Sequence, residues 1–331
     1  MQAWLDILRV ELRECNAHHG PMSDSVIVVF GAGQIGSLVA QRLLAAGHRV
    51  RQVRRTGGAT VDGRLEVRGG DVADLRFAEE AARGATALIH CAVPPYHQWT
   101  ELLEKVNDGV LHAAKTSKAP LVVLDNLYGY GRPDGPMTET SPVAPNSRKG
   151  ALRAKVAQKL LDAHRAGDAR VAIARASDFY GPGVTLTAVF GERFLGRARA
   201  GKGGECFGPP DLLHSYSYGP DVAAGLVTLA GAPQAWGEVW HLPVAPAEST
   251  RAVVARFGQE LGTPMSTSVV PGLVLQAMGL FVPAVKELLE MRYQWQVPFV
   301  LDDAKFRAAF KASATSLEQG VRETVRWLKA R

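Results

Sequence analysis

The sequence is poor in cysteine and has no long apolar run, and each absence excludes a class of protein. Its three cysteines lack the spacing of metal ligands or of a disulfide framework, so we expect no metal site and a reducing, cytoplasmic compartment. The longest apolar stretch, 269–285, is interrupted by Pro271 and Pro283 and is shorter than the roughly 20 residues that a membrane span needs. Nothing resembles a secretory signal. We therefore expect no membrane as a partner.

Charges of one sign do not gather in blocks. The 331 residues include 38 Lys and Arg and 32 Asp and Glu, interspersed along the chain, for a net charge of +6. A surface that follows nucleic-acid phosphates needs a clustered basic stripe, so nucleic acid is not an expected partner. With 47% apolar residues and no low-complexity segment, the composition is that of a globular protein. The length indicates one large α/β unit or two interleaved lobes.

A glycine-rich turn follows the first apolar run. The residues Val26–Phe30 predict a buried strand, and apolar residues at helical spacing follow the turn as far as Gly47. In such a turn the first glycine permits the tight bend, the second lets the backbone approach a pyrophosphate, the third permits close helix–strand packing, and the helix N-terminus attracts phosphate. A glycine turn without a ligand is the alternative. The residues predicted to form the dinucleotide site are Gly31, Gly33, Gln34, Ile35 and Gly36.

Apolar runs with helical intervals recur along the first half of the chain. Strands that alternate with helices imply a parallel sheet with right-handed crossovers, so we predict an α/β fold with a doubly wound Rossmann sheet. Later in the chain, 221–229 and 317–329 predict helices and 239–242 predicts a further strand. The additional strands of the first half are predicted at 48–53, 87–89, 121–124 and 171–174.

The residues after the second strand indicate which dinucleotide binds. NAD-binding proteins carry an Asp or Glu there, which accepts hydrogen bonds from the ribose 2′-hydroxyl. Here the residues at the end of the second strand are Arg54 and Arg55, and no carboxylate stands beside them in the sequence. Because a guanidinium pairs with the extra phosphate of NADP, these arginines favour NADP, although NAD and a merely solvated strand end stay open as alternatives. Asp71 and Val72 follow the next strand, where an Asp can bind the adenine amino group.

The alternation of strands and helices predicts a Rossmann domain at 25–180, and this rhythm changes after Tyr180. Residues 1–24 differ in character and carry one amphipathic pattern. They predict either an added helix or an extension upstream of a natural start at Met22, and we favour the extension.

Taken together, the motifs resemble the extended short-chain dehydrogenase/reductase superfamily, in its NAD(P)-dependent epimerase/dehydratase group, from Val26 to the C-terminus. The most specific element is Arg175-Ala-Ser-Asp-Phe-Tyr-Gly-Pro-Gly183. The resemblance implies a dinucleotide-binding Rossmann domain and a smaller, largely helical C-terminal substrate lobe, and it makes a homodimer plausible. The same family resemblance implies that a segment at about 220–245 returns to the Rossmann domain and that 181–219 and 246–331 form the substrate-binding lobe. It also places Cys91, Ala92 and Val93 against the cofactor. The other matching elements are the glycine turn, Gly70-Asp-Val72, Leu88-Ile-His-Cys-Ala92, Tyr130-Gly131, Glu139 with Pro142 and Pro145, Tyr218-Gly-Pro-Asp-Val222, and Leu317-Glu-Gln-Gly320 with Trp327.

The sequence departs from this family at the catalytic positions. Members carry a Ser or Thr at the end of the fifth strand and a Tyr-x-x-x-Lys pair on the next helix, in which the Tyr exchanges the proton and the Lys lowers its pKa and holds the nicotinamide ribose. The alignment places Asn126 at the Ser or Thr position and Lys149-Gly-Ala-Leu-Arg153 over the Tyr-x-x-x-Lys pair. The proton-transfer tyrosine is missing, so the chain resembles an atypical member.

Four side chains are therefore candidates for the chemistry. Tyr128 offers a phenol that nearby cations could acidify, and Lys149 could act as an acid, and contact the cofactor, if Arg153 and burial lower its pKa. Arg153 would hold the nicotinamide ribose or a substrate carboxylate, and Asn126 could donate to a carbonyl. Their structural alternatives are, in turn, a pocket-wall aromatic, a surface lysine, a salt-bridged arginine and a turn cap.

On the substrate side, the resemblance places Tyr180, His214 and Tyr216. Sugar-nucleotide epimerases often carry an Arg where His214 stands, and the loss of that bidentate diphosphate partner makes a UDP-sugar less favoured. The apolar segment 269–285 suggests either an apolar or aromatic small-molecule substrate or ordinary core packing.

We therefore expect an NADP(H)-dependent oxidoreductase of the atypical extended type that acts on a small carbonyl or an activated alkene. An epimerase or dehydratase with a retained cofactor is the second hypothesis. A non-catalytic NADP-sensing protein is the third.

Overall fold

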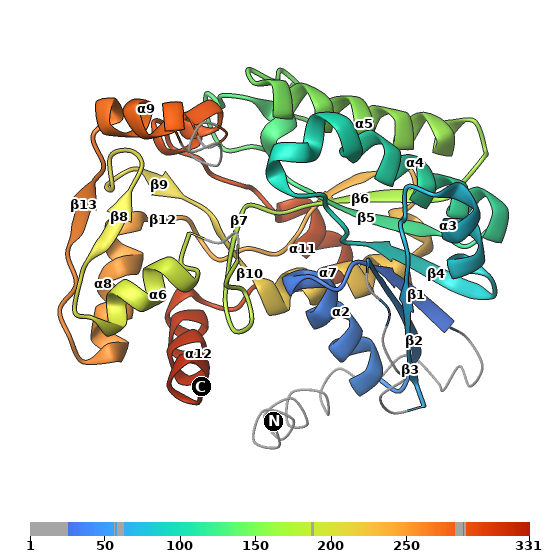
Figure 1. The fold of residues 1–331 in the computed structure, drawn as a ribbon, viewed down its shortest axis with the longest axis horizontal. Helices are drawn as coiled ribbons and strands as arrows, with labels where there is room; N and C mark the ends of the chain where they lie inside the picture. The colour runs from blue at the N-terminus through green and yellow to red at the C-terminus, as the bar shows by residue number, and fades with distance from the viewer. Residues whose placement is uncertain (1–25, 56, 58–62, 187–188, 282–286, 288) are drawn as a thin grey trace.

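The chain forms a layered sheet domain and a lobe built mostly of helices (Figure 1). The computed structural model describes residues 26–55, 57, 63–186, 189–281, 287 and 289–331. The predicted N-terminal extension, 1–24, lies outside these residues. Within them, no helix is long and apolar enough to cross a membrane.

The central sheet has seven strands in the order β11-β6-β5-β4-β1-β2-β3, and every neighbouring pair is parallel. This confirms the doubly wound sheet that the apolar runs predict. The strand order reverses between β1 and β4, and in such sheets ligands bind beyond the carboxyl ends of the strands at this switch point. The strands are β1 Val26–Phe30, β2 Arg49–Arg54, β3 Leu65–Gly69, β4 Ala85–His90, β5 Leu121–Asp125, β6 Val171–Arg175 and β11 Val239–His241.

Two helical layers cover the two faces of this sheet, which explains why its strands read as continuous apolar runs. Ile27 and Val29 of β1 pack toward one layer, and Val28 and Phe30 pack toward the other. The first layer holds α2 (Gln34–Ala45) and α7 (Gly219–Ala230). The second holds α3 (Leu75–Ala82), α4 (Trp99–Ser117) and α5 (Arg148–Arg165), as Figure 1 shows.

The second part, on the left of Figure 1, is a lobe whose core lies between three helices, in agreement with the predicted helical C-terminal part. These are α6 (Glu192–Arg199), α8 (Thr250–Leu261) and α12 (Leu317–Lys329). Short two-stranded sheets join its loops to the sheet domain, and α11 (Ala304–Phe310) packs beside β11. The short strands are β7 Asp178–Tyr180 with β10 Tyr216–Tyr218, β9 Leu213–His214 with β12 Glu248–Ser249, and β8 Gly204–Cys206 with β13 Thr267–Val269.

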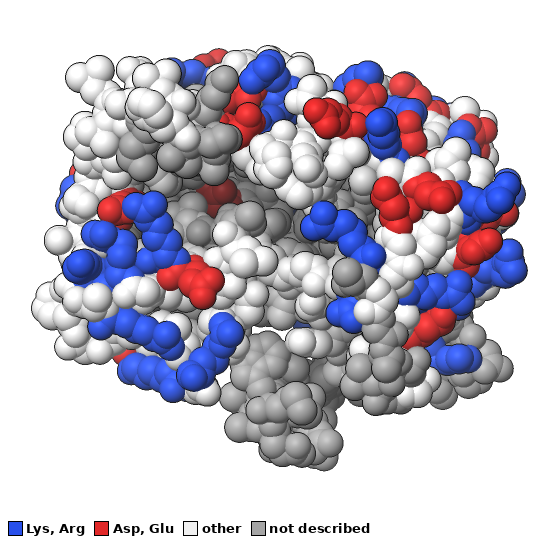
Figure 2. Space-filling view, viewed as in Figure 1, with Lys and Arg blue, Asp and Glu red and all other residues white. Residues whose placement is uncertain are grey.

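The apolar segment 269–285 is only partly described, and its described part includes helix α9 (Gly272–Phe281). Leu273, Leu280 and Phe281 are each about four-fifths exposed. These three side chains therefore face solvent and do not line the interior. Figure 2 shows few charged side chains around α9, at the upper left, whereas basic and acidic side chains are interspersed over the sheet domain.

A half-buried carboxylate connects α7 to the chain before α12 by hydrogen bonds. Asp221 accepts hydrogen bonds from the Thr315 backbone N–H (2.7 Å) and hydroxyl (2.8 Å). Burial raises the pKa of Asp221 from its ordinary 3.8 to about 6, against the opposing effect of the Thr315 hydrogen bonds. Because the folded state holds this proton more tightly than the unfolded state, the contribution of this group is largest below pH 3.8 and is lost as the pH rises through 6. The difference corresponds to on the order of 3 kcal/mol.

Asp221→Asn should therefore flatten the dependence of stability on pH between 4 and 7. The free energy of unfolding, measured with urea across this range, should fall less steeply for the variant than for the wild type. Asp108→Asn, at a carboxylate whose side chain is 41% exposed, is the control and should keep the wild-type slope. Equal slopes for Asp221→Asn and the wild type would contradict the assignment.

Candidate functional site

The glycine turn lies at the switch point, between β1 and α2. Gly31 has a φ of +117°, and a Cβ there would lie 2.8 Å from the Ala92 backbone nitrogen. A Cβ on Gly36 would lie 2.2 Å from the Gly31 carbonyl oxygen. Gly33 differs, because it is exposed and a Cβ there would have no atom within 4 Å. Packing thus requires Gly31 and Gly36, whereas Gly33 leaves open space beside the backbone.

This open space lies at the N-terminus of α2. Gly33 is the N-cap residue, no side chain caps this end, and the first turn holds no acidic residue. The N–H groups of the first turn can therefore receive an anionic ligand. Gln52, buried beneath the turn, places its amide nitrogen 3.4 Å from the Gly31 oxygen and 3.3 Å from the Gly36 oxygen. These features fit the pyrophosphate of a dinucleotide.

The other predicted cofactor residues lie around this turn. Gln34 accepts a hydrogen bond from the Leu186 N–H (3.1 Å), and Ile35 packs into the core. Asp71 is exposed and accepts from the Ala73 N–H (2.9 Å), while Val72 is buried.

Cys91, Ala92 and Val93 follow β4 directly. Cys91 donates its backbone N–H to Phe30 (2.8 Å), and Val93 is about half exposed. Burial raises the pKa of the Cys91 thiol to about 12. The thiol stays protonated near neutral pH, which argues against a cysteine nucleophile.

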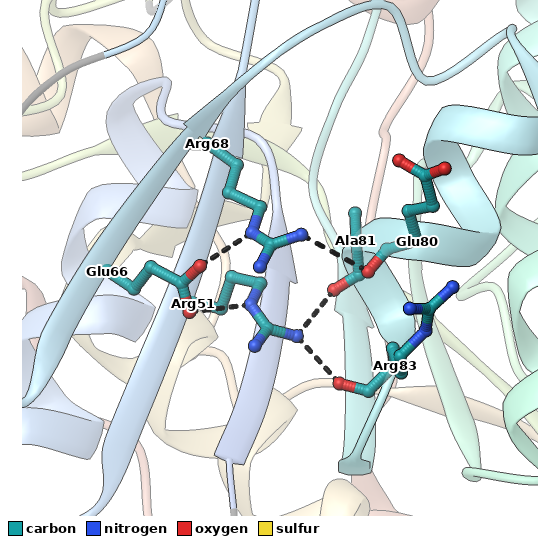
Figure 3. A network of polar contacts seen from close by, with 6 residues as sticks. All are labelled: Arg51, Glu66, Arg68, Glu80, Ala81 and Arg83. Atoms are coloured by element: carbon teal, nitrogen blue, oxygen red, sulfur yellow. Dashed lines mark hydrogen bonds and ion pairs between the residues drawn. The ribbon is translucent and has the colours of Figure 1, made fainter.

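The arginines of β2 and its end have different environments. Arg51 is held by Glu66 (2.8 Å) and by the carbonyls of Ala81 and Arg83 (2.9 and 2.8 Å), as Figure 3 shows. Arg68 binds the second oxygen of Glu66 (2.5 Å), so this carboxylate is neutralised by two guanidinium groups. Arg54 and Arg55 are exposed, and Arg54 donates to the Gly57 carbonyl (3.0 Å).

Behind the catalytic positions, one buried carboxylate serves two buried guanidinium groups. Asp125, at the end of β5, lies 3.4 Å from Arg153 Nη1 and 3.1 Å from Arg175 Nε. The Arg153 guanidinium also stacks on the ring of Trp99, 4.4 Å from its centre, and that of Arg175 on Tyr130 at 4.5 Å. Arg153 is therefore salt-bridged, yet its buried Nε has no partner among the described residues.

Lys149 is buried at the start of α5. Its ammonium contacts Glu287 and Glu290 of the lobe and lies 4.5 Å from the centre of the Tyr96 ring. The Lys149 backbone N–H also donates to Glu290 (3.0 Å). Burial lowers the pKa of Lys149, and Glu290 opposes this effect. The alternative of a surface lysine is wrong.

Tyr128 lies in a 3-10 turn, η2 (Tyr128–Tyr130), where its backbone N–H donates to the Asn126 side chain (3.1 Å). Asn126 is thus a turn cap, the structural alternative for this residue. The Tyr128 phenol is hydrogen-bonded with Tyr96 and Gln294. Burial raises its pKa to about 12, so the expectation that nearby cations acidify it is wrong: burial outweighs the effect of Arg153. At neutral pH the phenol is a hydrogen-bond donor.

The three predicted substrate residues fall into two environments. Tyr180 and Tyr216 are fully buried in the lobe core, where Tyr216 is hydrogen-bonded with Thr250 (2.7 Å). His214 is also buried, but its Nε2 lies 2.8 Å from Asp178 Oδ2. The structure therefore brings His214, and not the two tyrosines, toward polar groups near Tyr128.

Sequence reasoning missed several residues of this region. Asp178 stands inside the specific motif at Arg175–Gly183, and Tyr96 follows β4 closely, so their positions were available signals. Glu290 and Tyr293 carry no local signal, since loop packing alone brings them to α5 and η2. Tyr293 is buried, and its hydroxyl has no partner in the described part of the chain.

The fold and the glycine turn define a Rossmann-type dinucleotide-binding protein with an added, mainly helical lobe. The model of the NAD dependent epimerase/dehydratase family matches residues 26–242. The chain belongs to this family, which confirms the resemblance and the expected class of NAD(P)-dependent enzyme. No curated protein matches the chain.

Solved structures with the same fold are similar over nearly the whole chain. A dTDP-glucose 4,6-dehydratase from Bacillus anthracis, in complex with NAD, has a TM-score of 0.77 at 17% identity, with 93% of this chain and 97% of that chain covered. A UDP-glucuronic acid 4-epimerase from Bacillus cereus, in complex with NAD, has 0.75 at 18%, with 92% and 99% covered. A dTDP-glucose 4,6-dehydratase from Streptomyces venezuelae, with NAD bound, has 0.75 at 21%, with 92% and 97% covered.

Proposed function

We propose that this protein is an NADP(H)-dependent enzyme that transfers a hydride to or from a small carbonyl compound. The observation that carries the proposal is the open glycine turn at the switch point combined with two exposed arginines, Arg54 and Arg55, at the end of β2. The nearest carboxylate on the neighbouring strand, Glu66, is neutralised by two arginines, so it offers little repulsion to a 2′-phosphate.

When bound, the nicotinamide supplies or accepts the hydride. The chain's own residues would orient the carbonyl and handle its proton. Tyr128, a neutral phenol, donates a hydrogen bond to the carbonyl oxygen. Lys149 is the proton donor in this scheme, because burial lowers its pKa. The tyrosine whose pKa the family's lysine lowers is missing from this chain. Arg153, with its unpartnered Nε, holds the nicotinamide ribose or a substrate oxygen.

A second candidate function is an epimerase or dehydratase in which the hydride leaves and returns within one turnover. It is supported by the similarity to dehydratases and epimerases solved with NAD. The two functions differ in whether reduced nicotinamide is consumed. Net loss of NADPH absorbance with a carbonyl substrate supports the first function. Turnover without it, together with nucleotide that survives purification, supports the second.

Replacing both arginines after β2 should change the choice of cofactor. Arg54→Ala/Arg55→Ala should bind NADPH about tenfold more weakly or worse, since charge-assisted hydrogen bonds to the 2′-phosphate are lost. NADH affinity should change little. Isothermal titration calorimetry with both nucleotides measures the ratio.

Arg49→Ala is the control, because Arg49 is exposed at the opposite end of β2 and its loss removes an arginine charge from the same strand. It should leave the NADPH-to-NADH ratio unchanged. An unchanged ratio in the double variant would refute the NADP preference, and no binding of either nucleotide to the wild type would refute the proposed function itself.

A further inference from the structure

Polar side chains from both parts of the molecule converge beside Tyr128. Tyr96 comes from η1 (Tyr96–Gln98) after β4, Asp178 from β7, and Tyr293 and Gln294 from η4 (Arg292–Trp295) of the lobe. Tyr96 and Tyr128 pack against the apolar cluster that holds Tyr293 and Phe299, and Phe299 stacks on the His214 ring that binds Asp178. The Asp178 carboxylate also contributes to raising the pKa of all three phenols. We call these residues the phenol–carboxylate cluster.

Asp178 is fixed in this cluster by His214. The imidazole binds Asp178 Oδ2 and is itself held in an aromatic stack, 3° from the plane of Trp295 and 26° from that of Phe299. His214 is 3% exposed. Among the described residues, only Oδ2 of Asp178 has a hydrogen-bond partner, and the carboxyl group keeps about a fifth of its exposure. One carboxylate oxygen is therefore a fixed acceptor that a small molecule can reach.

Tyr293 supplies the second observation. Its ring is 7% exposed, and its buried hydroxyl lacks a partner in the described part of the chain. An unsatisfied buried hydroxyl costs free energy, and such groups call for a ligand or water. Its ring lies against Phe299, 6.5 Å between ring centres, and Phe299 stacks on His214. The pKa of Tyr293 is raised by burial first and then by Tyr128 and Asp178.

The charge of the surroundings restricts what can bind. Lys149 already lies against Glu287 and Glu290, and Arg153 against Asp125. A phosphate would therefore meet the Asp178 carboxylate beside two cations, Lys149 and Arg153, that already have carboxylate partners. Like charges at short range repel. A hydroxyl group can donate to Asp178, and an oxygen can accept from a neutral phenol.

We propose that Asp178, Tyr293 and Tyr128 form a substrate subsite for an uncharged molecule that carries a hydroxyl group next to its carbonyl, and that this subsite excludes phosphorylated substrates. The inference rests on the proposed function, because it names the substrate class of the same site. It also separates this chain from relatives whose names specify nucleotide-diphosphate sugars.

The test uses saturation-transfer NMR with two probes that differ only in a phosphate, dihydroxyacetone and dihydroxyacetone phosphate. The full chain is measured with and without oxidised NADP, which excludes turnover. We expect binding of dihydroxyacetone and none of its phosphate. Asp178→Asn should weaken dihydroxyacetone about tenfold and lessen the discrimination against the phosphate, and Tyr293→Phe should weaken it about fivefold.

Matched controls remove the same groups elsewhere. Asp221→Asn removes a half-buried carboxylate, and Tyr218→Phe removes a hydroxyl that binds Glu323; both should bind the probe as the wild type does. Because Asp178→Asn disturbs its contact with His214, Tyr293→Phe decides the matter if the first variant fails to fold. Equal binding of both probes, no binding of dihydroxyacetone, or wild-type binding by Tyr293→Phe would overturn the subsite. NADP binding, titrated separately, would still stand in each case.

Discussion

Gly33→Ala is expected to fold with wild-type stability and to lose most of its affinity for NADPH, whereas Gly36→Ala is expected to lose stability whether or not the cofactor is present. A Cβ on Gly33 meets no atom within 4 Å and its φ of −76° suits alanine, so the free protein tolerates it. The same methyl group would fill the space through which a pyrophosphate approaches the backbone. On Gly36 the Cβ would lie 2.2 Å from a backbone oxygen, and relieving that clash should cost about 3 kcal/mol or more.

Thermal unfolding with and without NADPH separates the two effects. A bound ligand raises the melting temperature according to its concentration relative to its Kd, so the wild type should show a clear rise. Gly33→Ala should melt at the wild-type temperature alone and show no rise with NADPH, while Gly36→Ala should melt lower in both conditions. If NADPH raised the melting temperature of Gly33→Ala as much as that of the wild type, the pyrophosphate of the cofactor would not bind against this residue.

Asp125→Asn is expected to lower the free energy of unfolding by about 3–5 kcal/mol, because it leaves two buried guanidinium groups without their counter-charge. Arg153 and Arg175 are each less than a tenth exposed, and both lie against this carboxylate. The amide keeps the shape of the carboxylate and removes only its charge. Unfolding in urea, followed by circular dichroism, measures the loss.

The matched control is Lys159→Ala, which breaks an ion pair with Asp108 on the surface. Because water and salt screen exposed charges, this variant should lose no more than about 1 kcal/mol. If Asp125→Asn loses as little as Lys159→Ala, the two arginines find other partners, and the carboxylate is not what holds them.

The sheet could be predicted from the sequence because its signals are local. Val26–Phe30 is apolar on both faces since helices cover both, and Gly36 is required by a contact within the turn itself, with the Gly31 oxygen. The helix at 317–329 matches its predicted bounds for the same reason: its apolar spacing and the Ser316 cap are both written in adjacent residues. Such elements need no knowledge of distant segments.

The candidate site could be predicted only in part, because its contacts join residues far apart in the chain. Lys149 was identified from the alignment, but its partner Glu290 comes from the lobe, and no local pattern announces that pairing. The environment of Tyr128 was misjudged for a related reason. The pKa of Tyr128 depends mainly on its burial by segments that are distant in the sequence, and the residues next to it in the sequence do not reveal this burial.

The contact between Lys149 and Glu290 also constrains how this protein can evolve. The two residues are separated by 141 positions, yet they share one backbone and one side-chain contact. Replacement of Lys149 alone leaves Glu290 and Glu287 without their counter-charge, so substitutions at position 149 should arise together with changes at these glutamates among descendants. A lineage that regains a tyrosine at position 149 should therefore also have replaced these glutamates.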